Sequence, residues 1–451
     1  MSDVIAAVST GNTLSAIGIL RLSGDGCAQV CEKVFTCRSG KPLSQAPNRK
    51  LILGDLHDSL GRVIDNCMAV YTRGPNSYTG EDTVEFHCHG SPAVLAAGLE
   101  ALYGSGARPA RRGEFTKRAF LNGRMDLTQA EAVIDLIEAE TAEAAANAAG
   151  QVGGTLLRKL TPVYDDLTDL CSHFHAVLDY PDEDIDDFRL AEYDTVLAQG
   201  ENTLDALLRT CKQGRILKNG IAAAIVGKPN VGKSSLLNAL AGFRRAIVTD
   251  IPGTTRDMVE QSVQLGELRL RLMDTAGIHA TDDPVEKIGV ERSFDALEQA
   301  ELILFVCDAS HPLDQEDRAI LDHLADRKNV IGLLNKCDLG QAVTELPLEE
   351  VIPISAKEGS GLERLSQAVA DRFAGDTPCD GSVLTNVRQS DAITRAREAL
   401  GNARQGLSLG FTPDAVLTDV EQAMNAIGEV TGATVRKDIT DRIFQRFCVG
   451  K

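Results

Sequence analysis

The sequence lacks a long apolar run and a cysteine pattern typical of disulfides. No apolar stretch approaches the roughly 18 residues of a membrane-spanning helix. Met1-Ser2-Asp3 starts neither the basic region nor the apolar core of a secretory signal. The 11 cysteines are scattered, odd in number and without a C-x-x-C pair, which favours reduced thiols over disulfides. These absences argue against a membrane or secreted protein and favour a cytoplasmic one.

The sequence also lacks an excess of basic residues. Acidic residues outnumber basic ones by 65 to 46, and the formal net charge is −19 at pH 7. Because like charge repels phosphate, this balance argues against broad, non-specific binding of nucleic acid. Any contact with RNA must therefore use a local basic patch.

The pattern of apolar residues changes along the 451-residue chain, which has room for about three domains. The first 118 residues mix strand and helix signals. Strands are expected at residues 16–22, 51–56 and 63–71, and a helix at 91–103. Between about 128 and 213, apolar residues recur at three- and four-residue spacing, which indicates long helices with a break at Tyr180-Pro181-Asp182.

From residue 221 to about 374, short apolar strands alternate with helices, which predicts a doubly wound parallel sheet. The expected strands are 221–226, 268–273, 302–306, 330–334 and 351–354. Helical periodicity returns after Thr385. We therefore expect an α/β P-loop domain inserted into an all-α helical domain and preceded by an α+β domain. The expected boundaries are 1–118 for the α+β domain, 216–375 for the P-loop domain, and 119–215 with 376–451 for the helical domain.

A phosphate-binding loop is expected between the first of these strands and the helix that follows it. Gly227-Lys228-Pro229-Asn230-Val231-Gly232-Lys233-Ser234 matches G-x-x-x-x-G-K-S/T. Backbone N–H groups of the loop and of the helix N-terminus would surround the phosphates. Lys233 would contact the β/γ oxygens, and the Ser234 hydroxyl would bind Mg²⁺. The strand and helix on either side argue against an ordinary Gly-rich turn.

Three further motifs end predicted strands. Asp338 of Asn335-Lys336-Cys337-Asp338 can accept from both N1–H and N2–H₂ of guanine, a donor pair that adenine lacks. Lys336 can lay its stem over the base, and Asn335 can bridge neighbouring loops. Ser355-Ala356-Lys357 can offer a backbone N–H to the guanine oxygen, and Asp274-Thr275-Ala276-Gly277 would face Mg²⁺ and the γ-phosphate. Asp338 alone could equally be a helix N-cap, but the order and spacing of the motifs indicate a GTPase.

The group that activates water is less obvious. Ile278 stands after the Asp274–Gly277 turn, where small regulatory GTPases have a water-orienting Gln. Hydrolysis must therefore use another side chain, and several carboxylates follow, Glu286 among them. The segment Thr249–Asp257 lies between the P-loop and this turn, and Thr255 is its expected Mg²⁺ ligand.

These motifs resemble the MnmE (TrmE) family of tRNA modification GTPases, and the resemblance runs essentially from end to end. In the GTPase region the motifs are Gly227–Ser235, Thr249–Asp257, Asp274–Gly277, Glu286–Arg292 and Asn335–Asp338. Outside it they are Gly74–Asp82, Gly113–Thr116, Arg118–Gly123 and Phe447–Lys451. Among them, the terminal Phe447-Cys448-Val449-Gly450-Lys451 is especially specific to the family.

The resemblance implies a potassium-activated GTPase in which K⁺ replaces an arginine finger. The K⁺ ligands would be Asn230, Thr249, Ile251 and Thr254, and the Mg²⁺ ligands Ser234 and Thr255. Glu286 matches the family's water-activating carboxylate and is the expected catalytic residue; without the resemblance it would be taken for a solvated helix residue. The residues expected to bind GTP are Asn230, Val231, Gly232, Lys233, Ser234, Ser235, Thr249, Asp250, Ile251, Pro252, Gly253, Thr254, Thr255, Asp274, Thr275, Ala276, Gly277, Asn335, Lys336, Asp338, Ser355, Ala356 and Lys357.

The resemblance also implies partners. In this family a homodimer of the GTPase joins the FAD-dependent MnmG (GidA) in a heterotetramer, and FAD is bound only by that partner. Together they attach an aminomethyl or carboxymethylaminomethyl group to C5 of the wobble uridine of certain tRNAs. The one-carbon unit comes from a tetrahydrofolate, for which the α+β domain resembles folate-binding folds and also forms the dimer contact.

The positions that match the family's folate contacts are Arg21, Glu85, Arg124 and Lys451. A Glu can pair with pterin N–H donors, and basic residues can meet the carboxylates of the folate tail. On pattern alone, an ion pair of Arg21 and Glu85 on an edge strand is an equal alternative. Arg124 stands where the family usually has Lys. A basic cluster could serve the folate tail or tRNA phosphates; its members are Arg108, Arg111, Arg112, Lys117, Arg118 and Arg124.

Several cysteine-containing patterns have a structural interpretation. Cys27, Cys31 and Cys37 are expected to be buried structural thiols. The two His of His87-Cys88-His89 share a strand face but have no third ligand in the sequence, so a metal site is not expected there. For Cys448, a structural thiol is at least as good an interpretation as a reactive one.

Two other functions share the central motifs. A ribosome-assembly GTPase would carry an RNA-binding module such as a KH domain with a G-x-x-G loop. A nucleotide-gated scaffold would use GTP only to switch partner binding. The helical flanks and the terminal Cys448–Lys451 argue against the ribosome-assembly factor, and analysis of the wobble uridine in cells lacking the protein distinguishes both from a modification enzyme.

Overall fold

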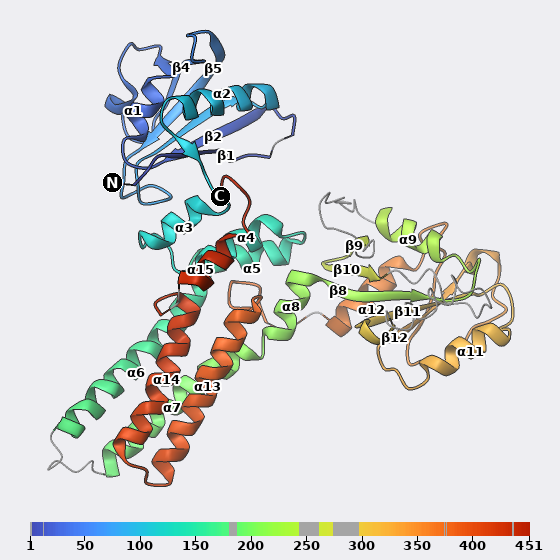
Figure 1. Ribbon diagram of the computed structural model, residues 1–451. Coiled ribbons are helices and arrows are strands. Elements are labelled where there is room, and N and C mark those ends of the chain that lie inside the picture. Colours follow the sequence, from blue (N-terminus) through green and yellow to red (C-terminus); the bar gives the residue numbers. More distant parts are fainter. Residues whose placement is uncertain are drawn as a thin grey trace, which may run out of the picture. The chain divides into compact units, whose positions relative to one another are not determined.

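The computed structural model describes residues 2–11, 13–179, 187–242, 261–273, 297–373, 375, 377–434 and 437–451 (Figure 1). The chain forms two compact units. The first comprises Met1–Ile134, Gln151–Ala198 and Glu398–Lys451, and the second comprises Asp135–Gly150 and Gln199–Arg397. Among the described residues, no helix is both long enough and apolar enough to cross a membrane.

A seven-stranded sheet forms the first part of the chain, in the order β3-β4-β5-β6-β2-β1-β7. Its strands are β1 (Ile5–Val8), β2 (Ile17–Ser23), β3 (Phe35–Cys37), β4 (Leu51–His57), β5 (Val63–Thr72), β6 (Thr83–His89) and β7 (Arg108–Pro109). All neighbours are antiparallel except β1 and β7. The expected strand at 16–22 is confirmed as β2, and those expected at 51–56 and 63–71 are confirmed as β4 and β5, which pair antiparallel.

Helical segments cover one face of this sheet: α1 (Cys27–Glu32), the short η1 (Leu43–Gln45) and α2 (Pro92–Gly104), the last of which confirms the helix expected at 91–103. Two glycines bring α2 close to β2. A Cβ on Gly18 would lie 2.6 Å from Leu95 of α2, and one on Gly98 would lie 2.6 Å from Leu20 of β2. As expected, the thiols of the first three cysteines are buried in this core.

Helices follow the sheet at α3 (Glu114–Leu121), α4 (Leu127–Glu138), α5 (Ala142–Val152), α6 (Thr155–Asp179), α7 (Asp187–Leu208) and α8 (Cys211–Asn219). Three more come late in the chain: α13 (Val387–Ser408), α14 (Pro413–Thr431) and α15 (Lys437–Phe444). In the first unit α6 packs along α14 (Figure 1), where the sulfur atoms of Cys171 and Met424 are 3.4 Å apart. These helices confirm the helical periodicity of both segments; the break expected at Tyr180-Pro181-Asp182 lies outside the described residues.

The second unit contains a six-stranded sheet in the order β13-β12-β11-β8-β10-β9. Its strands are β8 (Ile221–Val226), β9 (Gln261–Leu265), β10 (Leu268–Met273), β11 (Leu302–Asp308), β12 (Val330–Asn335) and β13 (Val351–Pro353). Helices α9 (Lys233–Gly242), α11 (Gln315–Leu324) and α12 (Leu362–Phe373), with the short η2 (Cys337–Leu339), belong to the same unit. The five expected strands are all present and parallel, and the sheet has one further strand, because β9 pairs antiparallel with β10 at the edge.

The central strand β8 has a core on each side of it. Ile221, Ala223 and Ile225 pack in the cluster that contains α9 and α12. Ala222, Ala224 and Val226 pack in the cluster that contains α11. Because helices cover both faces, β8 is apolar at every position. In such sheets ligands bind at the carboxyl ends of the parallel strands. Here this edge of the sheet includes the loop after β8 and the last residues of β11 and β12.

Candidate functional site

The loop between β8 and α9 packs tightly around two glycines. Gly227 has a φ of +151° and Gly232 a φ of +99°, which side chains rarely adopt. A Cβ on Gly227 would lie 2.1 Å from the Val306 carbonyl oxygen, and one on Gly232 would lie 2.3 Å from Asn335 Nδ2. Glycine at both positions therefore lets the loop backbone lie against the neighbouring strands, next to the N-terminus of α9, where N–H groups favour an anion.

Lys233 begins α9, and its side chain turns back over this loop. Its ammonium donates to the carbonyl oxygen of Gly227 and, at 2.9 Å, to that of Lys228. Burial lowers the pKa of Lys233. An ammonium has three donors, so one remains for an anion held by the loop.

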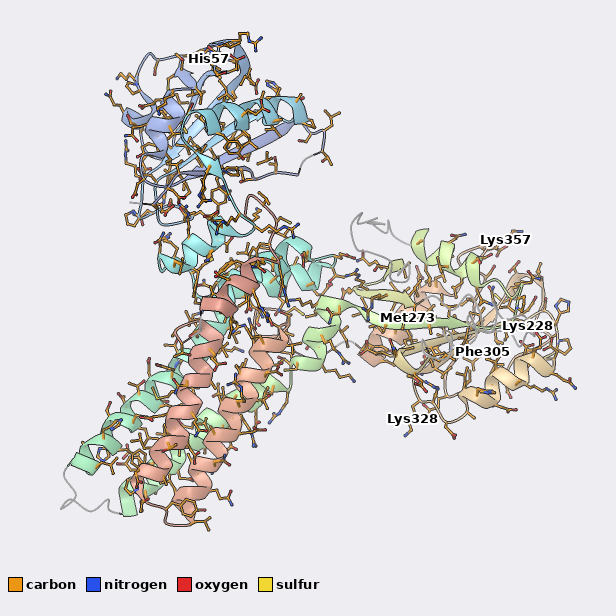
Figure 2. All side chains as sticks on the ribbon, viewed as in Figure 1. His57, Lys228, Met273, Phe305, Lys328 and Lys357 are labelled. Carbon is orange, nitrogen blue, oxygen red and sulfur yellow. The ribbon has the colours of Figure 1, made fainter. Side chains whose placement is uncertain are left out.

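Lys228, the second residue of the loop, connects the loop to α11; Figure 2 shows it beyond the carboxyl end of β8. Its ammonium lies 2.5 Å from Asp314 Oδ2 and 2.8 Å from Asp317 Oδ2. Burial lowers the pKa of Lys228, but hydrogen bonds to the two carboxylates raise it further than burial lowers it. Sequence analysis does not identify this contact, although Asp314 and Asp317 have the spacing of a capping box, which they form at the start of α11.

Asn335, the last residue of β12, joins two loops with one side chain. It is only 2% exposed. Its Nδ2 donates to the Val231 carbonyl at 2.7 Å, and its Oδ1 accepts from the backbone N–H of Ala356 at 3.0 Å. The P-loop and the loop Ser355-Ala356-Lys357 are therefore connected through a single buried amide.

Lys336 and Asp338, the other two residues expected to contact the guanine base, follow Asn335 closely in the sequence. Asp338 is exposed, and its Oδ1 accepts from the Ser355 hydroxyl at 2.6 Å. The ammonium of Lys336 lies 2.7 Å from Oδ2 of Asp308, the residue that ends β11. Burial raises the pKa of Asp308, but hydrogen bonds from Lys336 and Ser310 hold it at about 2. Sequence analysis does not identify Asp308, although a charged residue directly after an apolar strand is a usable signal.

The described residues contain part of the expected GTP site. They include residues 230–235 with Ser234 and Asn230, the group Asn335, Lys336 and Asp338, and the loop 355–357, of which Figure 2 labels Lys357. Outside the described residues lie 249–255 with Thr249, Ile251, Thr254 and Thr255, the turn 274–277, and Glu286. The loop after β8 and the loops that follow β12 and β13 are thus described, whereas Glu286, the expected water-activating residue, lies outside the described residues.

A second polar cluster lies on the sheet face opposite α1 and α2. Arg21 on β2 and Glu85 on β6 are direct cross-strand partners, and Arg21 Nε lies 2.7 Å from Glu85 Oε1. The guanidinium carbon is 5.5 Å and 5.8 Å from the ring centroids of Tyr78 and Phe115. The ion pair considered from the sequence therefore exists, but the expectation of an edge strand is wrong, because β2 and β6 are interior strands.

Lys451 lies near this pair. Its carbonyl oxygen accepts from the backbone N–H of Phe115 at 3.2 Å, which fixes the residue against α3. Burial and the charge of Arg21 lower the pKa of Lys451, while the charge of Glu85 raises it. Three of the four expected folate contacts are thus within electrostatic reach of one another.

The fourth expected contact and its basic neighbours are arranged differently. Arg124 Nε donates to the Ser77 carbonyl at 3.1 Å, one residue before the ring that lies over Arg21. Half of the basic cluster is neutralised: Arg108 pairs with Asp3 and Glu114, Arg118 with Asp3, Glu81 and Glu114, and Lys117 with Asp441. Arg111 and Arg112 are exposed. The positive patch expected from the sequence is therefore much reduced.

Comparison with known proteins covers the whole chain. The family model described as the MnmE helical domain matches residues 127–448, and the model described as the GTP-binding protein TrmE N-terminus matches residues 4–124. A tRNA modification GTPase MnmE of Alkaliphilus oremlandii is 41% identical over 460 residues, with 100% of both chains covered. The protein of the same name from Symbiobacterium thermophilum is 42% identical over 455 residues, covering 100% of this chain and 99% of the relative.

Proposed function

The chain belongs to the MnmE family of tRNA modification GTPases, and we propose that its GTP hydrolysis depends on potassium and drives modification of the wobble uridine. With a FAD-dependent MnmG partner in a heterotetramer, it installs an aminomethyl or carboxymethylaminomethyl group at C5 of that uridine in certain tRNAs. The one-carbon unit comes from a tetrahydrofolate, and the reaction takes place in the cytoplasm.

One observation carries the GTPase part of this proposal. Asn335 connects the P-loop to the Ser355-Ala356-Lys357 loop through two buried hydrogen bonds. The P-loop binds the phosphates of the nucleotide and the 355–357 loop binds its base. The Asn335 side chain therefore sets the distance between the two loops. Asp338, which Ser355 orients, then accepts from guanine N1–H and N2–H₂, and an adenine would leave it unpaired.

The described part of the phosphate loop suits a Mg²⁺-nucleotide and a K⁺ ion. Its two glycines stand where a Cβ would clash, so the backbone itself forms the cradle. Ser234 would hold Mg²⁺ together with Thr255, and Asn230 would supply an oxygen to K⁺ together with the 249–254 segment. The two cations neutralise the negative charge that develops on the phosphates.

The chain's own groups perform the remaining steps. Lys233 gives its third ammonium donor to the β/γ oxygens, since the other two already bind the Gly227 and Lys228 carbonyls. Glu286 orients the attacking water and accepts its proton through a second water. GDP and phosphate are the products.

A folate fits the cluster around Arg21. Among the guanidinium nitrogens of Arg21, only Nε has a hydrogen-bond partner in the described part of the chain, so both terminal NH₂ groups remain available as donors. Glu85 accepts from pterin N–H groups, and Arg21, Lys451 and Arg124 meet the carboxylates of the tail. The rings of Tyr78 and Phe115 supply the aromatic side of the site.

The homodimer uses the same domain. Ile17, Leu51, Leu53 and Met68 are exposed. Alternation along β2, β4 and β5 places all four on the sheet face opposite α1 and α2. An exposed apolar sheet face of this kind supports a contact with a second copy of the chain.

Hydrolysis rates in K⁺ and in Na⁺, at equal ionic strength, test the GTPase proposal. We expect rapid hydrolysis only in K⁺, and Asn230→Ala should lose both the activity and its dependence on K⁺. Asn219→Ala, which changes an exposed residue at the end of α8, is the matched control. Equal wild-type rates in the two salts would rule out potassium activation.

Analysis of the wobble nucleoside tests the modification proposal. Cells lacking the protein are complemented with wild type or with an Arg21→Ala, Glu85→Ala double variant. We expect the variant to hydrolyse GTP normally, to give no heat of binding with 5-formyltetrahydrofolate, and to leave the uridine unmodified. Full modification by this variant contradicts the folate assignment, and full modification in cells with no copy of the protein contradicts the proposed function as a whole.

A further inference from the structure

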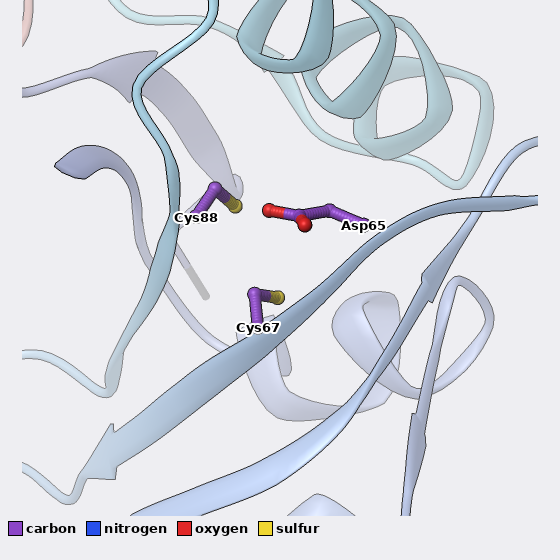
Figure 3. A group of neighbouring side chains, drawn as sticks. All are labelled: Asp65, Cys67 and Cys88. Atoms are coloured by element: carbon purple, nitrogen blue, oxygen red, sulfur yellow. The ribbon is translucent and has the colours of Figure 1, made fainter. Parts of the chain in front are cut away.

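A group of soft and hard metal-binding atoms lies on the helix-covered face of the N-terminal sheet. Asp65 and Cys67 are two residues apart on β5, and Cys88 is on the neighbouring strand β6. One carboxylate oxygen and the two Sγ atoms all lie within 4.8 Å of one another (Figure 3). Within the described ranges these are the residues that bring together three such atoms.

We propose that Asp65, Cys67 and Cys88 form a binding site for a thiophilic divalent cation such as Zn²⁺. Two thiolates and a carboxylate are a ligand set that Zn²⁺ accepts, at bond lengths of about 2.0–2.3 Å. Ligands at such lengths around a tetrahedral centre lie about 3.3–3.8 Å apart, so from separations of at most 4.8 Å the side chains need to move inward by no more than about 1.5 Å. The fourth position of a tetrahedral site remains for water or an external ligand.

The strand register explains why the two thiols meet. Met68 and His87 are direct partners of β5 and β6, so one further step of the antiparallel pairing sets Cys67 opposite Cys88. Directly opposite side chains on the same face are neighbours, and alternation then points Asp65 to that same face. The motif His87-Cys88-His89 alone contains no such ligand set, because Asp65 and Cys67 lie on the adjacent strand β5.

The carboxylate is already oriented. Asp65 is 9% exposed, and its Oδ2 accepts from the backbone N–H of His89 at 2.8 Å. The Nδ1 of the same histidine lies 2.7 Å from Asp65 Oδ1. Pairs of a carboxylate and a histidine that fix each other are typical around metal ligands, and the loss of such an outer partner typically weakens binding 10–100-fold. His89 is thus a positioning residue of the proposed site.

Burial makes a cation the natural compensation for these groups. Cys67 and Cys88 are 3% and 2% exposed. Metal binding forms the metal–sulfur bonds and releases the thiol protons to solvent.

Titration of the full-length, reduced and chelator-stripped protein with Co²⁺ tests the proposal. We expect one equivalent of Co²⁺ to produce a sulfur-to-cobalt charge-transfer band that Zn²⁺ then abolishes. A Mg²⁺ site of oxygen ligands produces no such band, so cobalt bound in the nucleotide site does not interfere. A wild-type protein without this band overturns the proposal, whatever the behaviour of the variants.

Variants then locate the site. Cys67→Ser and Cys88→Ser should each lose the band, and Cys31→Ser, which changes a buried thiol of the same core, should keep it. His89→Ala should weaken Co²⁺ binding about 10–100-fold, and its side chain is 75% exposed, so the fold should tolerate the change. An unchanged band in Cys67→Ser, or a Cys67–Cys88 disulfide in protein isolated without oxygen, refutes the assignment.

Discussion

Removal of the Asn335 side chain should loosen two loops at once. In Asn335→Ala, the Val231 carbonyl loses its donor and the Ala356 N–H loses its acceptor, and both residues are buried. An unpaired buried polar group costs about 1–3 kcal/mol, so the two together cost about 2–6 kcal/mol. Opening of the P-loop relieves the cost at Val231 alone, so even the lower value of about 1 kcal/mol raises the equilibrium constant for this opening about fivefold.

Hydrogen exchange read by mass spectrometry measures this opening directly. Peptides that cover residues 221–242 and 351–362 should exchange faster in Asn335→Ala than in the wild type. Peptides from β4 and β5, which belong to the other compact unit, should not change. Affinity for a fluorescent GTP analogue should fall, because the binding-competent loop arrangement is less populated.

Two control variants sharpen the result. Asn335→Asp keeps the acceptor for Ala356 but sets an oxygen against the Val231 carbonyl, so it should loosen the P-loop and leave the other loop protected. Asn329→Ala removes a side chain that donates to the Ala300 carbonyl at 2.8 Å, away from both loops, and should leave nucleotide affinity unchanged. Wild-type exchange rates of the P-loop in Asn335→Ala would refute the reasoning.

Three further predictions concern residues expected at the nucleotide site and the neighbouring Asp308. Asp338→Asn turns an acceptor into a donor toward guanine, so GTP affinity should fall by about 1–3 kcal/mol; competition binding that still separates GTP from ATP as before contradicts this. Glu286→Ala should slow hydrolysis in single-turnover measurements with nearly unchanged GTP affinity, whereas equal losses indicate a structural residue. The pKa of Asp308, held at about 2, is below its ordinary 3.8. Its ionised form therefore stabilises the fold above pH 3.8, by about 2 kcal/mol, and this stabilisation is lost as pH falls through about 2. Asp308→Asn should flatten that acid limb in urea unfolding, and an unchanged limb speaks against the Lys336–Asp308 contact.

The strands of the second sheet could be predicted to differing degrees. Strands β8, β11 and β12 are buried on both faces, so their sequences are nearly continuous apolar runs. Strand β10 instead alternates leucine with Arg269 and Arg271. Strand β9 has the sequence Gln-Ser-Val-Gln-Leu, in which only Val263 and Leu265 are buried among the described side chains. In an edge strand of this kind only alternate residues are apolar, so the sequence predicts it less clearly than a strand buried on both faces. The sequence of its antiparallel partner β10 does not indicate it either. The domain boundaries at 118, 215 and 375 stay predictions.

The site could be predicted where the chemistry is local in sequence. The P-loop glycines and Asn335 belong to short motifs whose order identifies them. Lys228 and Asp317 are 89 positions apart, so no local pattern connects them. The same holds for Asp65, Cys67 and Cys88, since only the register of β5 and β6 brings the two thiols together. Residue contacts that depend on tertiary packing cannot be predicted from sequence motifs, however clear those motifs are.

The residues just before Lys451 have a consequence for how the protein is made. Ser9 Oγ donates to the Gly450 carbonyl at 2.9 Å, across 441 positions of sequence, and Val449 pairs with Arg112. Translation delivers the N-terminal sheet first, but these contacts can close only after the helical segments and the nucleotide-binding unit have been synthesised. A nascent chain therefore displays Arg21 and Glu85 without Lys451 for most of its synthesis. A stop codon that removes residues 449–451 should therefore disturb a surface formed by the first strands of the sheet.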